Sequence, residues 1–325
     1  MIQSLRFVNY RVLRDAVLPL GPFTLLVGPN GSGKSTVLHA LRAVRSRMSG
    51  AAPTLKQIRS LAAGSETASL SISWAPPFED VVTEAVWTDT DVSLRPLNVP
   101  LRDFLRRLAT FSLNENAIVR PVPLGPGIRL AEDGGNLAGV LDQMRDENPE
   151  YFEKLNAELG SLIPEFDRIL FETPQQGQRA FLLRTRDGHH PIRAADLSQG
   201  TVLALAILTL AYSGEPPSMV CIEEPDRGIH PRLYREIRDA LYRLSYPEKF
   251  GLDRPPVQVL ITSHSPYMLD LHKDHPEEVV IAEKVGSEGT FSRLSDREDL
   301  DELLSEASLG EIWYSGVLGG VPAGT

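Results

Sequence analysis

The sequence predicts an α/β protein with a mainly parallel sheet, an antiparallel β region near its start and a mostly helical insertion in its middle. Three observations support this prediction. A glycine-rich turn at residues 28–36 joins an apolar strand directly to a helix. From residue 179 onward, β-rich runs alternate with helical ones, and such alternation favours a parallel sheet that is covered on both faces. Between 97 and about 175 the pattern changes to helical periods with Pro- and Gly-rich connectors.

The first part of the chain contains short β-rich segments around the glycine-rich turn. Strands are expected at 2–8, 12–20 and 23–27, and the helix after the turn should end near Ser49-Gly50. Alternating apolar residues predict a further strand at 67–74, with 85–94 as its partner.

The remaining elements follow from the same patterns. Helices are expected at 137–144 and 151–162, with a Pro- and Gly-rich connector around 121–127. Further strands are expected at 179–186, 219–222, 257–262 and 279–282, and helices at 198–212 and 232–244. We therefore expect three parts: a lobe with the glycine-rich turn (1–96), a mainly helical insertion (97–178) and a second lobe (179–325).

Composition excludes several classes of protein. The 325 residues are 42% hydrophobic and 23% charged, which is enough for a buried core. A net charge of −10 argues against a chain that coats nucleic acid by its overall electrostatic field.

The start lacks a secretion signal, and the longest apolar stretch, Thr201–Tyr212, is too short to span a bilayer, so we expect a cytoplasmic protein without membrane contact. The single cysteine, Cys221, rules out disulfides within the chain and is expected in a buried strand.

Two arginine groups could form local basic patches. Arg102, Arg106 and Arg107 fall on one side of a short helix, and a second group closes the helix after the glycine-rich turn: Arg42, Arg45 and Arg47. The favoured explanation for each group is a solvated face or cations at a helix C-terminus.

Residues 28–36, Gly-Pro-Asn-Gly-Ser-Gly-Lys-Ser-Thr, predict a phosphate-binding loop. The glycines let successive backbone N–H groups face inward, and the following helix adds its positive end. Lys34 is expected to reach the β- and γ-phosphates, and the Ser35 hydroxyl to bind Mg²⁺. The nucleotide-binding candidates in this loop are Asn30, Gly31, Ser32, Gly33, Lys34, Ser35 and Thr36.

Two carboxylates end the apolar run Met219–Ile222. A parallel sheet would place them beside the phosphate loop, because ligands bind at the carboxyl ends of its strands. Glu223 is expected to hold the Mg²⁺ shell, and Glu224 to orient the water that attacks the γ-phosphate. Many phosphate-loop enzymes have Asp at the first position, so Glu223 is a departure that adds one methylene.

Two further candidate sites lie at the end of a predicted strand and at the start of a predicted helix. His264 ends the β-rich run Val259–Ser263, where its imidazole could hydrogen-bond the γ-phosphate or the attacking water. Ser198 is expected to cap a helix whose first turn exposes N–H groups to an anion, with Gln199 and Gly200 beside it. The other histidines show no metal-ligand spacing.

These motifs together resemble those of the ABC-class ATPases. More narrowly, the chain is similar to the RecF/SMC-like, OLD-related ATPases of bacteria and archaea that are often labelled AAA-type. The segments that carry the resemblance span nearly the whole chain: 28–35, 133–141, 197–201, 221–231, 262–266 and 309–316. The segment 197–201 departs from the Leu-Ser-Gly-Gly-Gln form of transporters but keeps the serine and the second glycine.

The resemblance implies a P-loop NTPase sheet of ABC-ATPase type, with ATP and Mg²⁺ as its ligands. It also implies a homodimer that forms on ATP binding, in which Ser198 and Gly200 of one protomer cap the ATP on Lys34 and Ser35 of the other. DNA and a separately encoded effector are the further partners that it implies, in DNA-linked or phage-defence processes. A glutamine that links Mg²⁺ to the insertion is expected in the family, and Gln57 is a weak candidate. Because only about sixty residues follow His264, without an acidic nuclease group, we expect no intrinsic nuclease activity.

Two alternatives remain open from the sequence. A transporter ATPase subunit would share the loop, but about 160 residues separate Lys34 from Ser198 here, and residues 224–231 are of the RecF-like type. A kinase or GTPase would leave the Leu-Ser-Gln-Gly motif at 197–200 unexplained.

Overall fold

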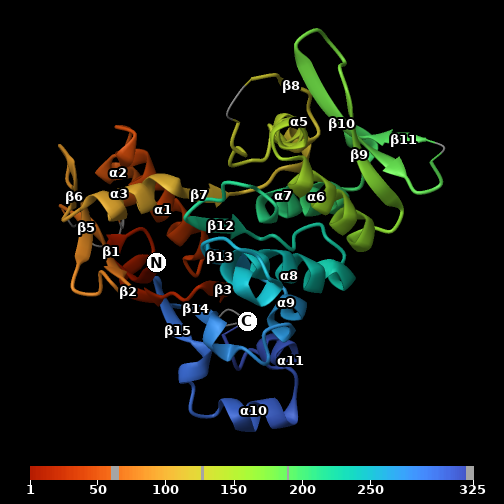
Figure 1. The fold of residues 1–325 in the computed structure, drawn as a ribbon. Coiled ribbons are helices and arrows are strands. Elements are labelled where there is room, and N and C mark those ends of the chain that lie inside the picture. Colours follow the sequence, from red (N-terminus) through yellow and green to blue (C-terminus); the bar gives the residue numbers. More distant parts are fainter. Residues whose placement is uncertain (60–65, 126–127, 189, 320–325) are drawn as a thin grey trace. The chain divides into compact units, whose positions relative to one another are not determined.

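The computed structural model describes residues 1–59, 66–125, 128–188 and 190–319. The chain divides into two compact units (Figure 1). The first consists of Met1–Thr110, Pro217–Glu223 and the chain from Pro256 onward, and the second of Phe111–Pro216 and Glu224–Pro255. The three-part division expected from the sequence, with limits at 96/97 and 178/179, stays a prediction.

A mainly parallel sheet organises the first unit. Its strand order is β15-β14-β3-β13-β12-β7, in which β14, β3, β13 and β12 run parallel and β15 is antiparallel to β14. The bounds are β3 (Phe23–Val27), β7 (Leu108–Phe111), β12 (Met219–Glu223), β13 (Gln258–Ser263), β14 (Val279–Val285) and β15 (Glu288–Arg293). All residues of β3 and β13 are buried, as expected for central strands of a parallel sheet.

An antiparallel sheet of five strands, in the order β2-β1-β4-β5-β6, completes the β structure of this unit. The strands are β1 (Ile2–Tyr10), β2 (Leu13–Pro19), β4 (Ala68–Trp74), β5 (Val82–Trp87) and β6 (Val92–Arg95). The prediction of one strand over 85–94 was wrong. The chain turns between β5 and β6, where Thr88 N donates to Asp91 O at 2.9 Å, because the Asp and Thr residues at 88–91 favour a turn.

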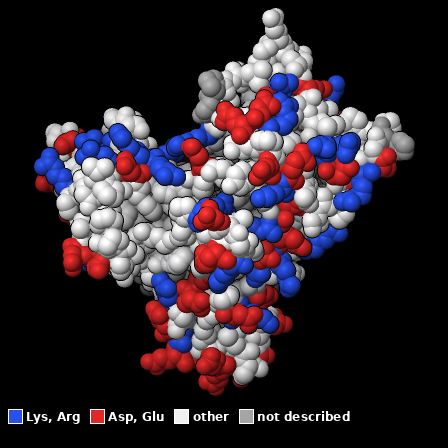
Figure 2. Space-filling model, viewed as in Figure 1, with Lys and Arg blue, Asp and Glu red and all other residues white. Residues whose placement is uncertain are grey.

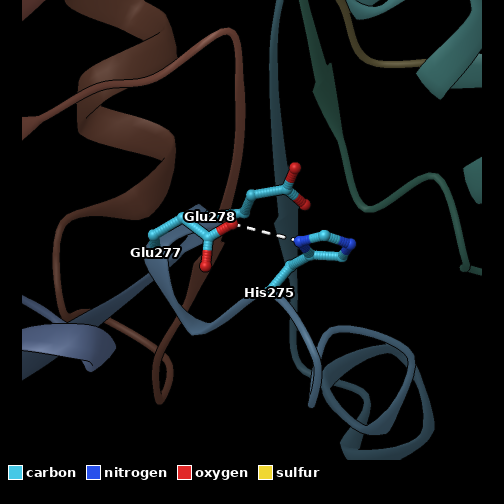
Figure 3. A group of neighbouring side chains, drawn as sticks. All are labelled: His275, Glu277 and Glu278. Carbon is cyan, nitrogen blue, oxygen red and sulfur yellow. Dashed lines mark hydrogen bonds and ion pairs between the residues drawn. The ribbon is translucent and has the colours of Figure 1, made fainter. Parts of the chain in front are cut away.

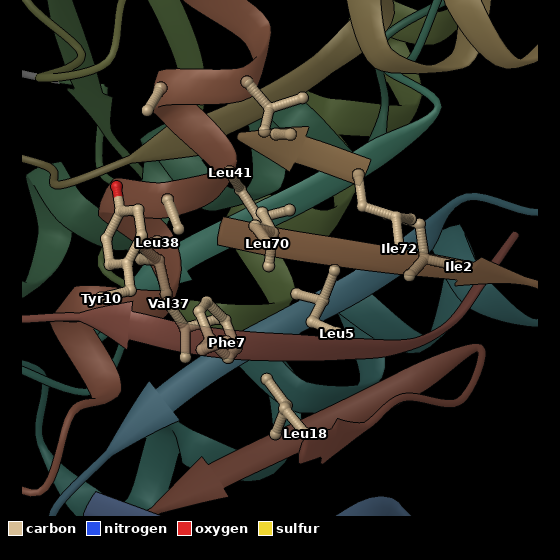
Figure 4. Packing of buried hydrophobic residues seen from close by; sticks show 14 of the residues in the cluster. Ile2, Leu5, Phe7, Tyr10, Leu18, Val37, Leu38, Leu41, Leu70 and Ile72 are labelled. Carbon is tan, nitrogen blue, oxygen red and sulfur yellow. The ribbon is translucent and has the colours of Figure 1, made fainter. Parts of the chain in front are cut away.

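The core of the first unit lies around helix α1 (Lys34–Met48). Apolar residues of α1 such as Val37 and Leu41 share one buried cluster with Phe7 and Leu70 of the antiparallel sheet (Figure 4). The cluster also includes Leu26 and other residues of the parallel sheet. Helix α1 therefore joins the two sheets through a common core, which fixes the helix that begins at the phosphate loop. The other α-helices of this unit are α2 (Leu55–Ile58), α3 (Val99–Arg107), α9 (Pro266–Asp270), α10 (Leu300–Glu306) and α11 (Leu309–Tyr314).

The second unit combines helices with a small antiparallel sheet. Its helices are α4 (Glu115–Ile118), α5 (Leu137–Glu147), α6 (Pro149–Leu162), α7 (Gln199–Ala211) and α8 (Tyr234–Ser245). Its strands are β8 (Val122–Pro123), β9 (Phe166–Glu172), β10 (Gln178–Thr185) and β11 (Pro191–Arg193). Helix α7 is buried from Thr201 to Ala211, which explains why its sequence is apolar all round. The fold class expected from the sequence is confirmed; β9 and β11 were not predicted, because charged residues interrupt the apolar pattern of one and the other has only three residues.

One buried side chain ties the antiparallel region to the parallel sheet. The Gln258 amide is 1% exposed; its Oε1 accepts from Ile2 N at 2.9 Å, and its Nε2 donates to Ile2 O at 2.6 Å and to Gly21 O at 3.0 Å. Three backbone groups, two of them buried and that of Gly21 partly buried, therefore depend on a single amide.

Replacing Gln258 with leucine, which is similar in volume, should lower the free energy of unfolding by about 2–4 kcal/mol, because the substitution leaves these backbone groups buried without partners. Urea unfolding followed by circular dichroism measures the change, with Gln3→Leu, at an exposed position of β1, as the control. Equal stability of the two variants would show that the amide is dispensable.

Candidate functional site

The phosphate loop lies between the end of β3 and the start of α1, as the sequence predicts. Gly31 and Gly33 have φ values of 77° and 107°, a left-handed region that glycine adopts without strain. Gly28 is required for a different reason, since a Cβ atom there would collide with the carbonyl oxygen of Ala282 on β14. The loop therefore has the curved backbone that points N–H groups toward a phosphate.

The side chains of the loop differ in exposure. Asn30, Gly31 and Ser35 are exposed, whereas Ser32, Lys34 and Thr36 are buried. Lys34 Nζ donates to the carbonyl oxygens of Gly28 at 2.6 Å and Pro29 at 3.0 Å, so its ammonium lies within the curve of the loop. Among the described residues, the buried Ser32 Oγ has no hydrogen-bond partner. A phosphate oxygen would satisfy such a hydroxyl, and this fits a loop built to bind phosphate.

Parallel pairing brings three candidate positions to one edge of the sheet. Glu223 pairs with Thr262 across β12 and β13, and Thr262 pairs with Leu26 across β13 and β3. The three strands thus end at the same level, where the phosphate loop, Glu223 and His264 follow directly. This is the edge at which a parallel sheet binds its ligand.

Oxygen ligands for a divalent cation are present at this edge. Ser35 offers an exposed hydroxyl and Glu223 a half-buried carboxylate, and Mg²⁺ prefers such oxygen ligands together with water and phosphate. The donor set therefore fits Mg²⁺, and these two side chains are the ones that would hold it.

Glu224 has an unusual backbone. It follows Glu223 with a φ of 45°, one of three non-glycine residues with positive φ in the described chain. The turn after it is closed by Arg227 N, which donates to Glu224 O at 3.0 Å. Non-glycine residues are held in this region at a cost and are often found at functional sites. Like Glu224, the His264 side chain is half-buried.

In the second unit, Ser198 is the N-cap of α7. Its Oγ accepts from Thr201 N at 3.2 Å, and the side chains of Ser198 and Gln199 are exposed. Gly200 is needed for close packing, since a Cβ there would lie 2.9 Å from the carbonyl oxygen of Gly228. The Gln199 side chain covers Gly228 in turn. The Leu197–Thr201 segment is therefore built against the turn that follows Glu224, within one compact unit.

Several other residues that the sequence singled out form hydrogen bonds within the fold or are buried. Gln57 Oε1 accepts from Thr54 N at 2.8 Å and so caps α2. Arg42 and Arg47 donate to Thr110 Oγ1 and Val92 O, whereas Arg102 and Arg106 are exposed. Cys221 is buried as predicted, and burial raises the pKa of its thiol, so the thiol is unreactive. His189 lies outside the described residues.

No metal-ligand spacing was predicted around the other histidines, but two acidic residues closely follow His275 in the sequence, and the three side chains form a group of possible metal ligands. His275, Glu277 and Glu278 bring ligand atoms within 4.8 Å of one another (Figure 3). His275 Nδ1 lies 3.1 Å from Glu277 Oε1, and the buried Glu278 carboxylate lies 3.1 Å from His272 Nδ1. These residues precede β14, which runs parallel to β3, so they lie at the edge of the sheet opposite the phosphate loop. They therefore form no part of the phosphate site.

Comparison with known proteins identifies the family. Residues 90–270, more than half of the chain, match the model "AAA domain, putative AbiEii toxin, Type IV TA system", and residues 1–70 match an AAA ATPase domain. An OLD nuclease from Thermus scotoductus (strain ATCC 700910 / SA-01) is 24% identical over 375 residues, which covers 95% of this chain and 68% of the nuclease.

Solved structures agree on the fold. The Smc head bound to the C-winged helix domain of ScpA has a TM-score of 0.65 at 15% identity, covering 90% of this chain and 96% of that one. The recombination mediator protein RecF with ATPrS has a TM-score of 0.50 at 12% identity, covering 90% and 98%. Among the described residues, no helix combines the length and apolar character needed to cross a membrane.

These matches confirm the resemblance to RecF/SMC-like, OLD-related proteins, and the transporter alternative has no support in them. The chain therefore belongs to the family of this AAA-domain model, and it shares its fold with the SMC head and RecF.

Proposed function

We propose that this protein hydrolyses ATP to ADP and phosphate at the sheet edge formed by β3, β13 and β12. The observation that carries the proposal is the register that ends these strands together, with the phosphate loop, Glu223 and His264 directly after them. The family membership supports ATP as the nucleotide. In this reaction the chain supplies positioning and electrostatic stabilisation rather than covalent chemistry.

Each candidate residue has a defined role in the proposed reaction. The loop residues Asn30, Gly31, Ser32, Gly33 and Thr36 surround the phosphates, and Lys34 neutralises the β- and γ-phosphates. Glu224 orients the attacking water and accepts its proton, while His264 hydrogen-bonds the γ-phosphate or that water. Mg²⁺, held by Ser35 and through water by Glu223, would neutralise charge on the phosphates when bound.

We further propose that two copies close face to face around ATP. The support is the exposed cap of α7: Ser198 and Gln199 present polar side chains and a positive helix end, next to Gly200, to a partner's γ-phosphate. Closing on ATP and opening after hydrolysis would make the protein a switch. In this proposal the switch acts in DNA-linked or phage-defence processes and controls a separate effector, in the cytoplasm.

Lys34→Ala should weaken ATP binding by roughly thirtyfold, because charge-assisted hydrogen bonds contribute about 2 kcal/mol. Isothermal titration with ATP and Mg²⁺ measures this loss. Unchanged affinity would contradict the assignment of the loop.

Glu224→Gln should lower hydrolysis by about a hundredfold or more, because the amide cannot accept a proton from water. ATP binding should persist, so the variant should accumulate as a closed dimer. Size-exclusion chromatography with light scattering, with and without ATP, checks the dimer.

The matched control for Glu224→Gln is the double variant Glu224→Gln/Ser198→Arg, in which a bulky cation obstructs the cap. The double variant should bind ATP and stay monomeric. A Glu224→Gln chain that is monomeric with saturating ATP at micromolar concentration would contradict the sandwich.

We expect duplex DNA to stimulate ATP hydrolysis by binding the basic residues of α3. Figure 2 shows Lys and Arg side chains gathered over α3 and its neighbours in the first unit, and Arg102 and Arg106 are exposed there. Reversing both to Glu should abolish stimulation of hydrolysis by duplex DNA at low salt, while Lys154→Glu/Lys249→Glu, at exposed positions of the second unit, should retain it. Stimulation that survives in the first variant would exclude the patch.

A further inference from the structure

The hairpin of β14 and β15 packs against the phosphate loop. Gly28 packs on Ala282 of β14, and a Cβ on Gly289 of β15 would lie 2.5 Å from the carbonyl oxygen of Ser32. Gly289 N also donates to Val12 O at 2.9 Å, and Arg14 Nη1 lies 2.8 Å from Glu288 Oε1. The hairpin is therefore fixed both to the loop and to the β1–β2 turn.

This hairpin carries a second lysine to the loop. Lys284 pairs with Gly289 across the hairpin, and its Nζ lies 3.8 Å from the position that a Cβ would take on Gly31. Gly31 is exposed at the tip of the loop, and the Lys284 side chain is exposed as well. A cationic side chain thus lies at the rim of a loop that already contains Lys34.

The neighbouring acids do not neutralise this ammonium. Glu288 is engaged by Arg14, and Glu283 projects to the other face of the strand, where its carboxylate lies beside Gly319. Within the described ranges, 1–59, 66–125, 128–188 and 190–319, no acceptor forms a hydrogen bond or ion pair with Lys284 Nζ. A lysine on a flexible stem is a mobile point charge suited to phosphate.

We propose that Lys284 is a second cationic side chain that binds the phosphates of the nucleotide. It contributes mainly to affinity for the triphosphate, whereas Lys34 holds the phosphates from within the loop. The inference rests on the proposed ATPase function and extends its binding site to β14. Because the ammonium is exposed, its contribution is screened by salt.

The test measures binding of AMP-PNP with Mg²⁺ to the full chain by isothermal titration at 50 and 500 mM KCl. Lys284→Met should weaken binding by roughly three- to tenfold at the lower salt concentration and less at the higher one. Lys284→Arg, which keeps the charge, should stay within about twofold of the parent chain. In hydrolysis assays, Lys284→Met should raise KM for ATP more than it lowers kcat.

Lys273→Met is the matched control, because Lys273 is an exposed lysine of the same unit that precedes β14 at the opposite edge of the sheet. It should bind AMP-PNP like the parent chain. Affinity of Lys284→Met within twofold of the parent, an equal loss in Lys273→Met, or an equal loss in Lys284→Arg would overturn the inference. If the parent chain binds AMP-PNP and Lys34→Ala binds it much more weakly, such a result overturns the role of Lys284 alone. A parent chain that binds none overturns the proposed function as well.

Discussion

The parallel pairing of β3 with β13 and of β13 with β12 is the constraint on which the candidate site depends. Side chains alternate between the two faces of a strand, so a slip of one residue would move Glu223 and the residues around it to the wrong face. The register is protected by burial: β3 and β13 are buried along their whole length, and a shifted register would expose or misplace this apolar surface. Core packing along these strands therefore fixes where the chemical groups at their ends lie.

Close backbone contacts at glycine give the loop its rigidity. Gly33 faces Leu13 of β2, Gly28 faces Ala282 of β14, and Gly289 of β15 faces Ser32. A side chain at any of these positions would push two segments apart, so the loop is held between two hairpins that come from opposite ends of the chain. A loop held in this way keeps its N–H groups oriented before a ligand arrives, and preorganised donors lose less entropy on binding.

The sequence was informative where local chemistry decides the structure, and less so where tertiary contacts decide it. Glycines with positive φ, the strand before the loop and the Ser198 cap were all predictable, because each depends on a few adjacent residues. The division of 85–94 into two strands and the existence of β9 depend on which partner strand is available, which composition does not reveal. Lys284 lies 250 positions after Lys34, and only the pairing of β14 with β3 brings it to the loop.

The backbone at Glu224 connects the fold to the proposed chemistry. A non-glycine residue with a φ of 45° costs about 1–3 kcal/mol, and the following Pro225 restricts its conformation further. Glycine at this position would remove the strain, so stability alone does not account for a glutamate. The strained residue comes directly after a strand that is buried from Met219 to Ile222 and closes a turn with Arg227, so the surrounding structure can sustain the cost. A carboxylate kept at this point despite the strain is what a water-orienting base requires, since the base must be held in place before the γ-phosphate is attacked.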